Sequence, residues 1–312
     1  MALLPKPSSS ILAQGWRNCY RTPHYKHLTI ISSPFFSSYT YTLLHHPPLL
    51  LPRVPTACLR TFSLFNHPSL SKTTGNSLLP RMEKSFSGSG DGKKKSEAMV
   101  ERLQRCGVFH SEKVAEVMET IDRGLFVPAG TPAYVDSPMP IGHNATISAP
   151  HMHAMCLELL KDKLQPGMHA LDVGSGTGYL TACFAMMVGP KGRAVGIEHI
   201  PELVTWSIEN IKKSEAAPLL EEGSLSVHVG DGRLGYPEAA PYDAIHVGAA
   251  APEIPKALVE QLKPGGRLVI PVGTFFQDLQ VIDKEQDGSL STRTETSVRY
   301  VPLTSREEQL RG

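Results

Sequence analysis

The stretch LDVGSGTGYLTA, residues 171–182, places three glycines at alternate positions between two apolar segments. It predicts a short strand, a sharp turn and the start of a helix. Glycine has no Cβ, so the backbone of such a turn can fold tightly and approach a ligand closely. The first turn of the following helix adds backbone N–H groups that have no partner within the helix. The stretch therefore predicts a ligand site at the carboxyl end of the strand.

Three familiar glycine motifs differ from this loop at defined positions. A phosphate-binding P-loop has a lysine after its last glycine, where this chain has Gly178, Tyr179 and Leu180. The dinucleotide fingerprint GxGxxG has its third glycine one residue later than Gly178. A nucleophile elbow around Ser175 needs a glycine at the position of Val173. The remaining pattern fits a site for an adenosyl cofactor that has no pyrophosphate.

Outward from this loop, short apolar runs alternate with helical patterns. Strands are predicted at residues 169–174, 194–198, 225–230, 242–248, 267–273, 278–283 and 297–303, and helices at residues 96–107, 112–123, 149–164, 177–189, 201–213 and 255–262. Alternating strands and helices predict an α/β fold whose mostly parallel sheet is covered by helices on both faces. No helix separates the last two strands, so we expect an antiparallel C-terminal edge.

An acidic residue stands at or just after the end of each of the first three strands. Asp172 lies at the end of the first, Glu198 ends the second and Asp231 follows the third. The carboxyl ends of parallel strands meet at one edge of the sheet, where α/β proteins bind their ligands. These carboxylates could accept hydrogen bonds from an amino group, from both ribose hydroxyls and from the edge of an adenine. S-adenosylmethionine has all three of these groups. The alternative is three unrelated acids in solvated loops.

The first 82 residues differ in composition from the rest of the chain. They contain no Asp or Glu but eight Lys or Arg residues. A basic, acid-free, Ser/Thr-rich N-terminus is typical of a transit peptide, so we expect import into a chloroplast or mitochondrion. A disordered basic tail without targeting value is the alternative. Met82 could start a shorter form that stays in the cytoplasm or nucleus.

The Gly, Ser and Lys content of residues 83–95 predicts a flexible linker before a folded domain at residues 96–312. The formal net charge of +1 gives no indication of nucleic-acid or membrane binding. No run of the N-terminal segment reaches the roughly 20 apolar residues that a membrane span needs. The five cysteines form no CxxC pair, which favours buried thiols in a reducing compartment.

The segment NATISAPHMHA, residues 144–154, combines one serine and two histidines at the start of a helical pattern. Ser148 lies two residues before Pro150, which suits a first helical position, so the serine could be a helix cap, a substrate contact or both. His151 and His153 alone do not make a zinc site, because zinc needs three or four ligands and no further His or Cys cluster is nearby. We therefore expect no metal.

Five segments resemble, in order and at similar spacing, the protein-L-isoaspartate O-methyltransferase family. They are ATISAPHMHA (residues 145–154), ALDVGSGTGYLTA (170–182), GDGRLGYPEAAPYDAIHVGAAAP (230–252), LKPGGRLVIPVG (262–273) and YVPLT (300–304). The resemblance runs from about Ser96 to the C-terminus and implies a Rossmann-like fold that uses S-adenosyl-L-methionine. It also implies methylation of the free carboxylate of L-isoaspartyl residues in damaged proteins. The ester then closes to a succinimide, which reopens in part to aspartate.

The resemblance also assigns roles to individual positions, with Ser148 as the active-site serine. The implied cofactor contacts are Thr146, Ile147 and Ser148 beside the substrate, His153, the loop residues Asp172, Val173, Gly174, Ser175 and Gly176, the ribose acid Glu198, Gly230 and Asp231 at the adenine, and Thr304 and Gln309 over the cofactor. Some members have an aspartate in place of Glu198. The family's partners are isoaspartyl proteins and peptides, and its members are usually monomers.

The implied reaction needs no strong base, because a carboxyl group with a pKa of about 4 is already ionised at pH 7. The protein's task is then to align two reactants in a dry site. We expect Ser148 to donate a hydrogen bond to one carboxylate oxygen and so to aim the other. A methyltransferase with a different acceptor and a cofactor-binding protein without catalysis are the alternatives. The presence of Ser148 and Asp172 argues against the second.

Overall fold

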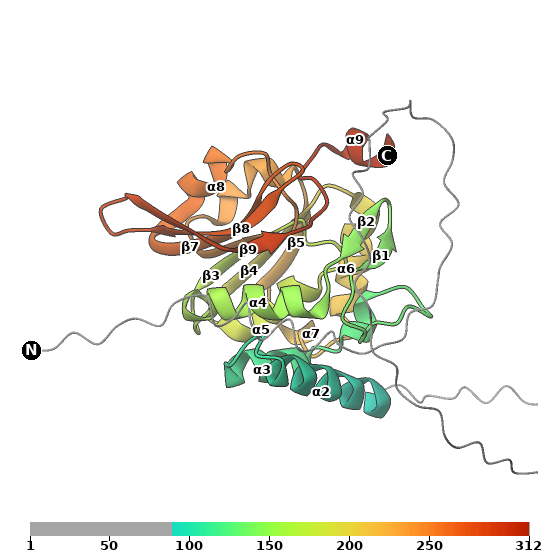
Figure 1. Ribbon diagram of the computed structural model, residues 1–312. Helices are drawn as coiled ribbons and strands as arrows, with labels where there is room; N and C mark the ends of the chain where they lie inside the picture. The colour runs from blue at the N-terminus through green and yellow to red at the C-terminus, as the bar shows by residue number, and fades with distance from the viewer. Residues whose placement is uncertain (1–88, 312) are drawn as a thin grey trace, which may run out of the picture. The chain divides into compact units, whose positions relative to one another are not determined.

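Seven strands form one sheet in the order β5–β4–β3–β6–β7–β8–β9 (Figure 1). The computed structural model describes residues 89–311. The strands are β3 (His169–Val173), β4 (Arg193–Glu198), β5 (Leu225–Val229), β6 (Tyr242–Val247), β7 (Leu262–Gly273), β8 (Gln277–Lys284) and β9 (Leu290–Val298). Strands β3 to β7 pair in parallel, whereas β8 and β9 are joined by antiparallel pairing. The predicted Rossmann-like fold and its antiparallel C-terminal edge are confirmed.

The strand order reverses at β3, which lies between β4 on one side and β6 on the other. At such a point the connections that follow the two neighbouring strands run to opposite sides of the sheet. This separation leaves a crevice at the carboxyl ends of the strands. The glycine loop follows Val173 at the end of β3, and Glu198 ends the neighbouring β4. Both therefore lie at the crevice.

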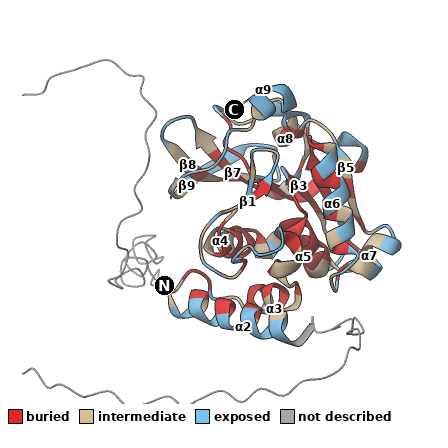
Figure 2. Cartoon of the chain, turned by 90° about the vertical axis from the view of Figure 1, so that its right-hand side faces the viewer, coloured by how far each residue is buried: buried red, intermediate tan, exposed pale blue. Residues whose placement is uncertain are grey.

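Helices cover the two faces of the sheet unequally (Figures 1 and 2). The helices are α2 (Ser89–Arg105), α3 (Glu112–Thr120), α4 (Pro150–Leu160), α5 (Tyr179–Val188), α6 (Pro201–Ile211), α7 (Ala217–Glu221), α8 (Lys256–Gln261) and α9 (Arg306–Arg311). Helices α2 to α6 share one buried core with the small strand residues Ala170, Ala194 and Ala244. The opposite face buries larger residues, such as Leu171 and Ile245, against α8 and the loop before it. Small strand residues let the helices of the first face lie close to the sheet.

The first helix begins earlier than the sequence predicted. Helix α2 starts at Ser89, so the prediction of a flexible linker was wrong for residues 89–95. A Cβ on Gly92 would come within 2.1 Å of the Asp122 carboxylate and 3.3 Å of the Tyr134 hydroxyl. The missing side chain therefore lets the helix pack against the next loop, and this tertiary contact outweighs the low helix propensity of glycine. The predicted transit segment and residues 83–88 lie outside the described residues.

The last strand also differs from its prediction. Strand β9 covers Leu290–Val298, whereas the sequence predicted a strand at residues 297–303. Most of its side chains are exposed, so it lacks the apolar alternation that reveals a half-buried strand. The later part of the predicted run instead forms hydrogen bonds with Ala250, in the loop after β6. Ala250 donates its N–H to the Val301 carbonyl, and Leu303 donates its N–H to the Ala250 carbonyl, both at 2.8 Å. Residues 297 and 298 end β9, whereas residues 299–303 belong to the site rather than to the sheet.

Arg267 of β7 joins the antiparallel edge to the helical layer. Its Nε and Nη2 donate to the Asp283 carboxylate on β8 at 2.6 and 3.0 Å, and its Nη1 donates to the Leu159 carbonyl on α4 at 2.8 Å. Burial raises the pKa of Asp283, but Arg267 and Arg293 outweigh it and hold the pKa below its usual value. The carboxylate is thus stabilised in its charged form by the fold.

Asp283→Asn is expected to lower the free energy of unfolding at pH 7 by about 1 kcal/mol, since the lost ion pair is partly exposed. A carboxyl pKa that is depressed in the folded state stabilises the fold above its unfolded value near 3.8, and this gain is lost as the pH falls through the folded pKa. Urea titrations should therefore show a difference at pH 7 that shrinks near pH 3. The exposed Asp162→Asn is the control, and an equal difference at both pH values would contradict the prediction.

Candidate active site

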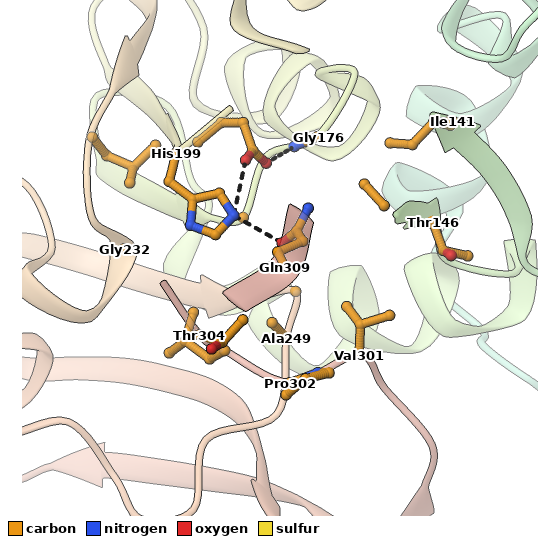
Figure 3. A pocket seen from close by; sticks show the side chains of 16 residues that line it. Ile141, Thr146, Gly176, His199, Gly232, Ala249, Val301, Pro302, Thr304 and Gln309 are labelled. Atoms are coloured by element: carbon orange, nitrogen blue, oxygen red, sulfur yellow. Dashed lines mark hydrogen bonds and ion pairs between the residues drawn. The ribbon is translucent and has the colours of Figure 1, made fainter. Parts of the chain in front are cut away.

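Two adjoining cavities lie at the carboxyl ends of β3 and β4. The first, which we call the outer cavity, has a volume of about 570 Å³ (Figure 3), and the second, the inner cavity, about 380 Å³. Predicted site residues line both: Thr146, Gly174 and Gly176 are shared, Glu198, Thr304 and Gln309 line the outer cavity, and Ile147, Ser148, His153, Asp172 and Ser175 line the inner cavity. The fold thus brings most of the predicted residues together from segments far apart in the sequence.

Three of the predicted contacts line neither cavity. The side chain of Val173 packs in the core on the far side of the sheet, and its carbonyl accepts a hydrogen bond from Gly248 at 2.8 Å. The Asp231 carboxylate accepts from the Arg233 backbone at 3.0 Å and from its guanidinium at 2.7 Å, which lowers the pKa of Asp231. Gly232, next in the chain, lines the outer cavity in its place. Adenine contacts by Gly230 and Asp231 stay a prediction.

The glycine loop has the backbone conformation that its sequence predicts. Gly174, Gly176 and Gly178 have φ angles of 74°, 55° and 92°, in the left-handed region that favours glycine. At Gly178 a Cβ would also lie 2.4 Å from the Ser207 hydroxyl oxygen of α6. The start of α5 can therefore approach α6 only because this position has no side chain.

Glu198 fixes the glycine loop as well as facing the outer cavity. Its Oε2 accepts from the backbone N–H of Gly176, and its Oε1 accepts from the backbone N–H of Ile200, each at 3.0 Å. Figure 3 shows the first of these bonds at the wall of the outer cavity. The side chain is almost fully buried, at 7% exposure. One carboxylate thus joins the ends of β3 and β4 where both meet the ligand site.

The C-terminal helix closes the outer cavity through Gln309. The side-chain amide donates to the His143 carbonyl at 3.0 Å, and its oxygen lies 2.8 Å from the His199 Nε2 (Figure 3). The Asn144 side chain donates in turn to the Gln309 carbonyl at 2.9 Å. His143 and Asn144 form the turn between β1 (Met139–Gly142) and β2 (Ala145–Ile147), with φ angles of 52° and 55°. Gln309 lines the outer cavity, and its contact with the cofactor stays a prediction.

Ser148 follows β2 directly and does not cap the next helix. Ala149 is the N-cap of α4, no side chain caps its N-terminus, and Pro150 occupies the first turn. Ser148 lines the inner cavity and also a more open cleft of about 1470 Å³ beside residues 296–301. Tyr300 lines the same cleft, and burial and Cys156 raise the pKa of its phenol. The serine therefore stands where the two spaces meet.

Arg123 supports Ser148 from behind, and nothing in the sequence pattern pointed to it. Its side chain is fully buried and donates from Nη2 to the Ser148 carbonyl at 2.6 Å and from Nε to the Ala133 carbonyl at 2.8 Å. Its Nη1 lies 2.9 Å from the His153 Nδ1, and its guanidinium carbon is 5.5 Å from the centre of the Tyr179 ring. A buried guanidinium with this many directed bonds fixes the groups around it.

Arg123 also sets the protonation state and the tautomer of His153. Burial lowers the pKa of His153 well below its usual value, and the charge of Arg123 lowers it further. The ring is therefore neutral at pH 7. Because Arg123 can only donate, His153 Nδ1 accepts and the ring hydrogen lies on Nε2. His151 binds elsewhere, with Nδ1 2.7 Å from the Asp136 carboxylate. Within residues 89–311, no three His, Cys, Asp or Glu side chains gather as a metal site.

Comparison with known proteins decides which family this site represents. Residues 94–308 match the sequence profile of the protein-L-isoaspartate(D-aspartate) O-methyltransferases. The chain belongs to this family. Protein-L-isoaspartate O-methyltransferase of Triticum aestivum is 76% identical over 216 residues, which are 69% of this chain and 94% of the wheat protein. The Arabidopsis thaliana enzyme numbered 2 is 66% identical over 250 residues, 80% of each chain.

Solved structures agree with this assignment to the protein-L-isoaspartate O-methyltransferases. A putative family member from Plasmodium falciparum, crystallised with S-adenosyl-L-homocysteine, has a TM-score of 0.62 and 35% identity. The comparison covers 67% of this chain and 98% of that one. This chain is accordingly a methyltransferase whose methyl donor is S-adenosyl-L-methionine.

The residues of the cavities fit this methyl donor. The Glu198 carboxylate at the outer cavity can accept hydrogen bonds from both hydroxyls of a ribose. The Asp172 carboxylate at the inner cavity has the charge that complements an ammonium and a sulfonium. A Cβ on Gly176 would come within 3.2 Å of the Ile141 Cδ1, between the two spaces. Gly176 and Ile141 line both cavities, so a side chain at position 176 would crowd Ile141 there.

Glu198→Gln is expected to weaken the binding of S-adenosylhomocysteine by about tenfold or more. The amide offers one acceptor where the carboxylate offers two, so either Gly176 or Ile200 loses its bond, which costs about 1–3 kcal/mol. Calorimetric titration measures the change. Glu202→Gln, in the first turn of α6, is the matched control. Equal affinity of the wild type and the Glu198 variant would show that the carboxylate is not part of the ligand site.

Proposed function

We propose that this protein-L-isoaspartate O-methyltransferase works by positioning alone, with Ser148 aligning the isoaspartyl carboxylate against the methyl donor. The chain transfers the methyl group of S-adenosyl-L-methionine to the free carboxylate of L-isoaspartyl residues in damaged proteins, which starts their conversion to aspartate through a succinimide. The observation that carries the residue-level proposal is the place of Ser148. It lines the inner cavity and the wider cleft at the same time.

The reaction needs no general base from the protein. One oxygen of the carboxylate forms a bond to the methyl carbon, the bond from that carbon to sulfur breaks, and its electron pair stays on sulfur. No proton moves, because the carboxylate is ionised before it binds. The protein can therefore contribute most by holding the two groups in line and excluding water.

The cleft suits a polypeptide that approaches from solvent. Residues 296–301 line it together with Thr146, Ser148 and Met152. In an isoaspartyl residue the main chain runs through the β-carboxyl, and the free α-carboxylate branches from it. This carboxylate can reach Ser148 from there while the flanking residues stay in the cleft. The Ser148 hydroxyl would donate to one carboxylate oxygen, and the backbone of Ser148 is held by Arg123. The hydroxyl is thus an orienting group and not a nucleophile.

Two peptides that differ only in Asp or isoAsp at one position test the acceptor. The chain is incubated with labelled S-adenosyl-L-methionine and each peptide, and base-labile methyl ester is counted. Label in the isoAsp peptide alone is the expected result. Equal label in both would indicate a methyltransferase with a different acceptor rule. No label in either, with cofactor binding intact, would indicate a protein that binds the donor without catalysis.

The N-terminal segment supports a proposal for location. We propose that residues 1–82 direct the chain to a chloroplast or mitochondrion, on the basis of their basic, acid-free composition. Fusion of these residues to a fluorescent protein, followed by imaging with markers for both organelles, tests this. Diffuse fluorescence would overturn it. Translation from Met82 would give a cytoplasmic or nuclear form, which a chain lacking residues 1–81 would reproduce.

No helix within residues 89–311 has the length and apolar character to cross a bilayer.

We further propose that the catalytic domain acts as a monomer, as the resemblance implies. Sedimentation of the full chain over a wide range of concentrations gives its mass directly. A single species of about one chain mass is expected, and a species of twice that mass would overturn the proposal.

A further inference from the structure

The turn between β7 and β8, residues 274–276, presents two phenylalanines to solvent. Phe275 is 99% exposed and Phe276 is 94% exposed, more than any other large apolar side chain within residues 89–311. Gly273, which ends β7, has a φ of 127°, and a Cβ there would collide with the Phe276 carbonyl oxygen. This phenylalanine turn therefore closes only over a glycine, and its own chain covers neither ring.

Gln277, the first residue of β8, ties the phenylalanine turn to the cleft at Ser148. Its side-chain amide donates to the Thr274 carbonyl at 3.2 Å and to the Tyr300 carbonyl at 3.1 Å. Its side-chain oxygen accepts from the Tyr300 N–H at 2.6 Å. Tyr300 lines the cleft that also reaches Ser148. The turn is thus fixed relative to the place where the acceptor carboxylate enters.

A second cleft, of about 1730 Å³, extends from the phenylalanine turn. Phe275 and Thr274 line it, and it shares Arg299 and Tyr300 with the cleft at Ser148. The two clefts therefore adjoin at residues 299 and 300. A polypeptide that extends from Ser148 past these residues would reach the exposed rings.

We infer that the phenylalanine turn and the second cleft bind an apolar side chain of the acceptor polypeptide, a few residues from the isoaspartyl residue. This inference rests on the proposed function, because the acceptor carboxylate at Ser148 fixes one point of the path. Successive side chains of an extended chain point to opposite sides, so one of them can contact the rings while the main chain continues. A folded protein keeps most such side chains in its core. The surface therefore favours damaged segments whose local fold is lost.

A second copy of this chain and a membrane are the other candidate partners of the rings. Two aromatic rings bury at most about 300–500 Å², whereas each partner of a stable interface buries about 800 Å². The charged side chains that line the second cleft have both signs: Arg233, Arg299, Glu253 and Glu308. Such a lining does not form the basic cluster that anionic lipids attract. One apolar side chain of a polypeptide fits the size of the patch better than either.

The test compares isoaspartyl peptides of equal length that carry Phe or Ser at one position, which is moved along both sides of the isoaspartyl residue. Fluorescence anisotropy on the full chain measures their affinity with S-adenosylhomocysteine present, so no methyl group is transferred. At the best position the wild type should bind the Phe peptide about tenfold more tightly, since partial burial of one ring suffices for this. In the double variant Phe275→Ser and Phe276→Ser, the ratio should fall to about twofold or less, with unchanged affinity for the Ser peptide.

Leu290→Ser is the matched control, because Leu290 is an exposed apolar residue that lines neither cleft. It should retain the ratio of the wild type. Equal binding of Phe and Ser peptides by the wild type at every position would overturn the inference. Equal loss of both peptides in the double variant would also overturn it, because the turn would then bind the main chain and not an apolar side chain.

Two further measurements assign the rings if a different partner occupies them. A dimer in sedimentation that the double variant loses would assign them to a second copy, and binding to phosphatidylcholine vesicles that the variant loses would assign them to a membrane. Either result without discrimination between the peptides overturns the inference. Discrimination without formation of methyl ester from S-adenosyl-L-methionine would support the inference and remove the proposed reaction. Methylation of both peptides with equal affinity would support the proposed reaction and remove the inference.

Discussion

Ser148→Ala is expected to lower kcat for an isoaspartyl peptide by about a hundredfold. The loss follows from orientation, since a misplacement of about 1 Å between reacting groups can cost that much. The affinity for S-adenosylhomocysteine should change by about twofold or less, because Glu198 and the glycine loop, which line the outer cavity, stay intact. Steady-state kinetics together with calorimetry separates the two effects.

The control for this variant is Ser291→Ala, an exposed residue of the edge strand β9. It should match the wild type in both measurements. Unchanged turnover of Ser148→Ala would remove the serine from the mechanism. A parallel loss of turnover and ligand affinity would make it a binding residue for the methyl donor instead of an orienting group for the acceptor.

Arg123→Met is expected to lower the free energy of unfolding by about 3–5 kcal/mol. The substitution leaves three acceptors without a donor: the Ala133 carbonyl and His153 Nδ1, which are buried, and the Ser148 carbonyl, which is partly buried. Each unsatisfied group costs about 1–3 kcal/mol, and partial relaxation reduces the sum. Denaturant titrations with equal slopes measure the change, and turnover of the folded variant should also fall because Ser148 loses its support.

Two further variants separate the loss of the directed hydrogen bonds from the loss of the positive charge. Arg123→Lys retains the charge but not the three directed donors, so we expect an intermediate loss of stability. Arg306→Met, at an exposed position in the first turn of α9, should change stability by less than about 0.5 kcal/mol. A loss below about 1 kcal/mol for Arg123→Met would show that the carbonyls find water or other partners and that Arg123 is not structural.

The errors of sequence-based prediction have physical causes. The polar residues of β9 form an edge strand with little burial on either face, so no apolar alternation marked it. Gly92 lowers the helix propensity of residues 89–95, yet it is the glycine that allows α2 to pack against Asp122 and Tyr134. In both cases the local signal was weak or misleading, because the deciding contact comes from a segment distant in sequence.

The sequence by itself determined the parallel sheet, its antiparallel edge and the glycine turn, because these follow from apolar periodicity and from residues that tolerate left-handed backbone. It also placed Asp172 and Glu198 at strand ends, where the topology must bring them to one edge. Only the tertiary structure decided that Arg123 supports Ser148 and that His246 pairs with Asp172 beside the inner cavity. These are long-range contacts between single polar side chains, which have no periodic signature, and their strength arises from burial that the fold creates.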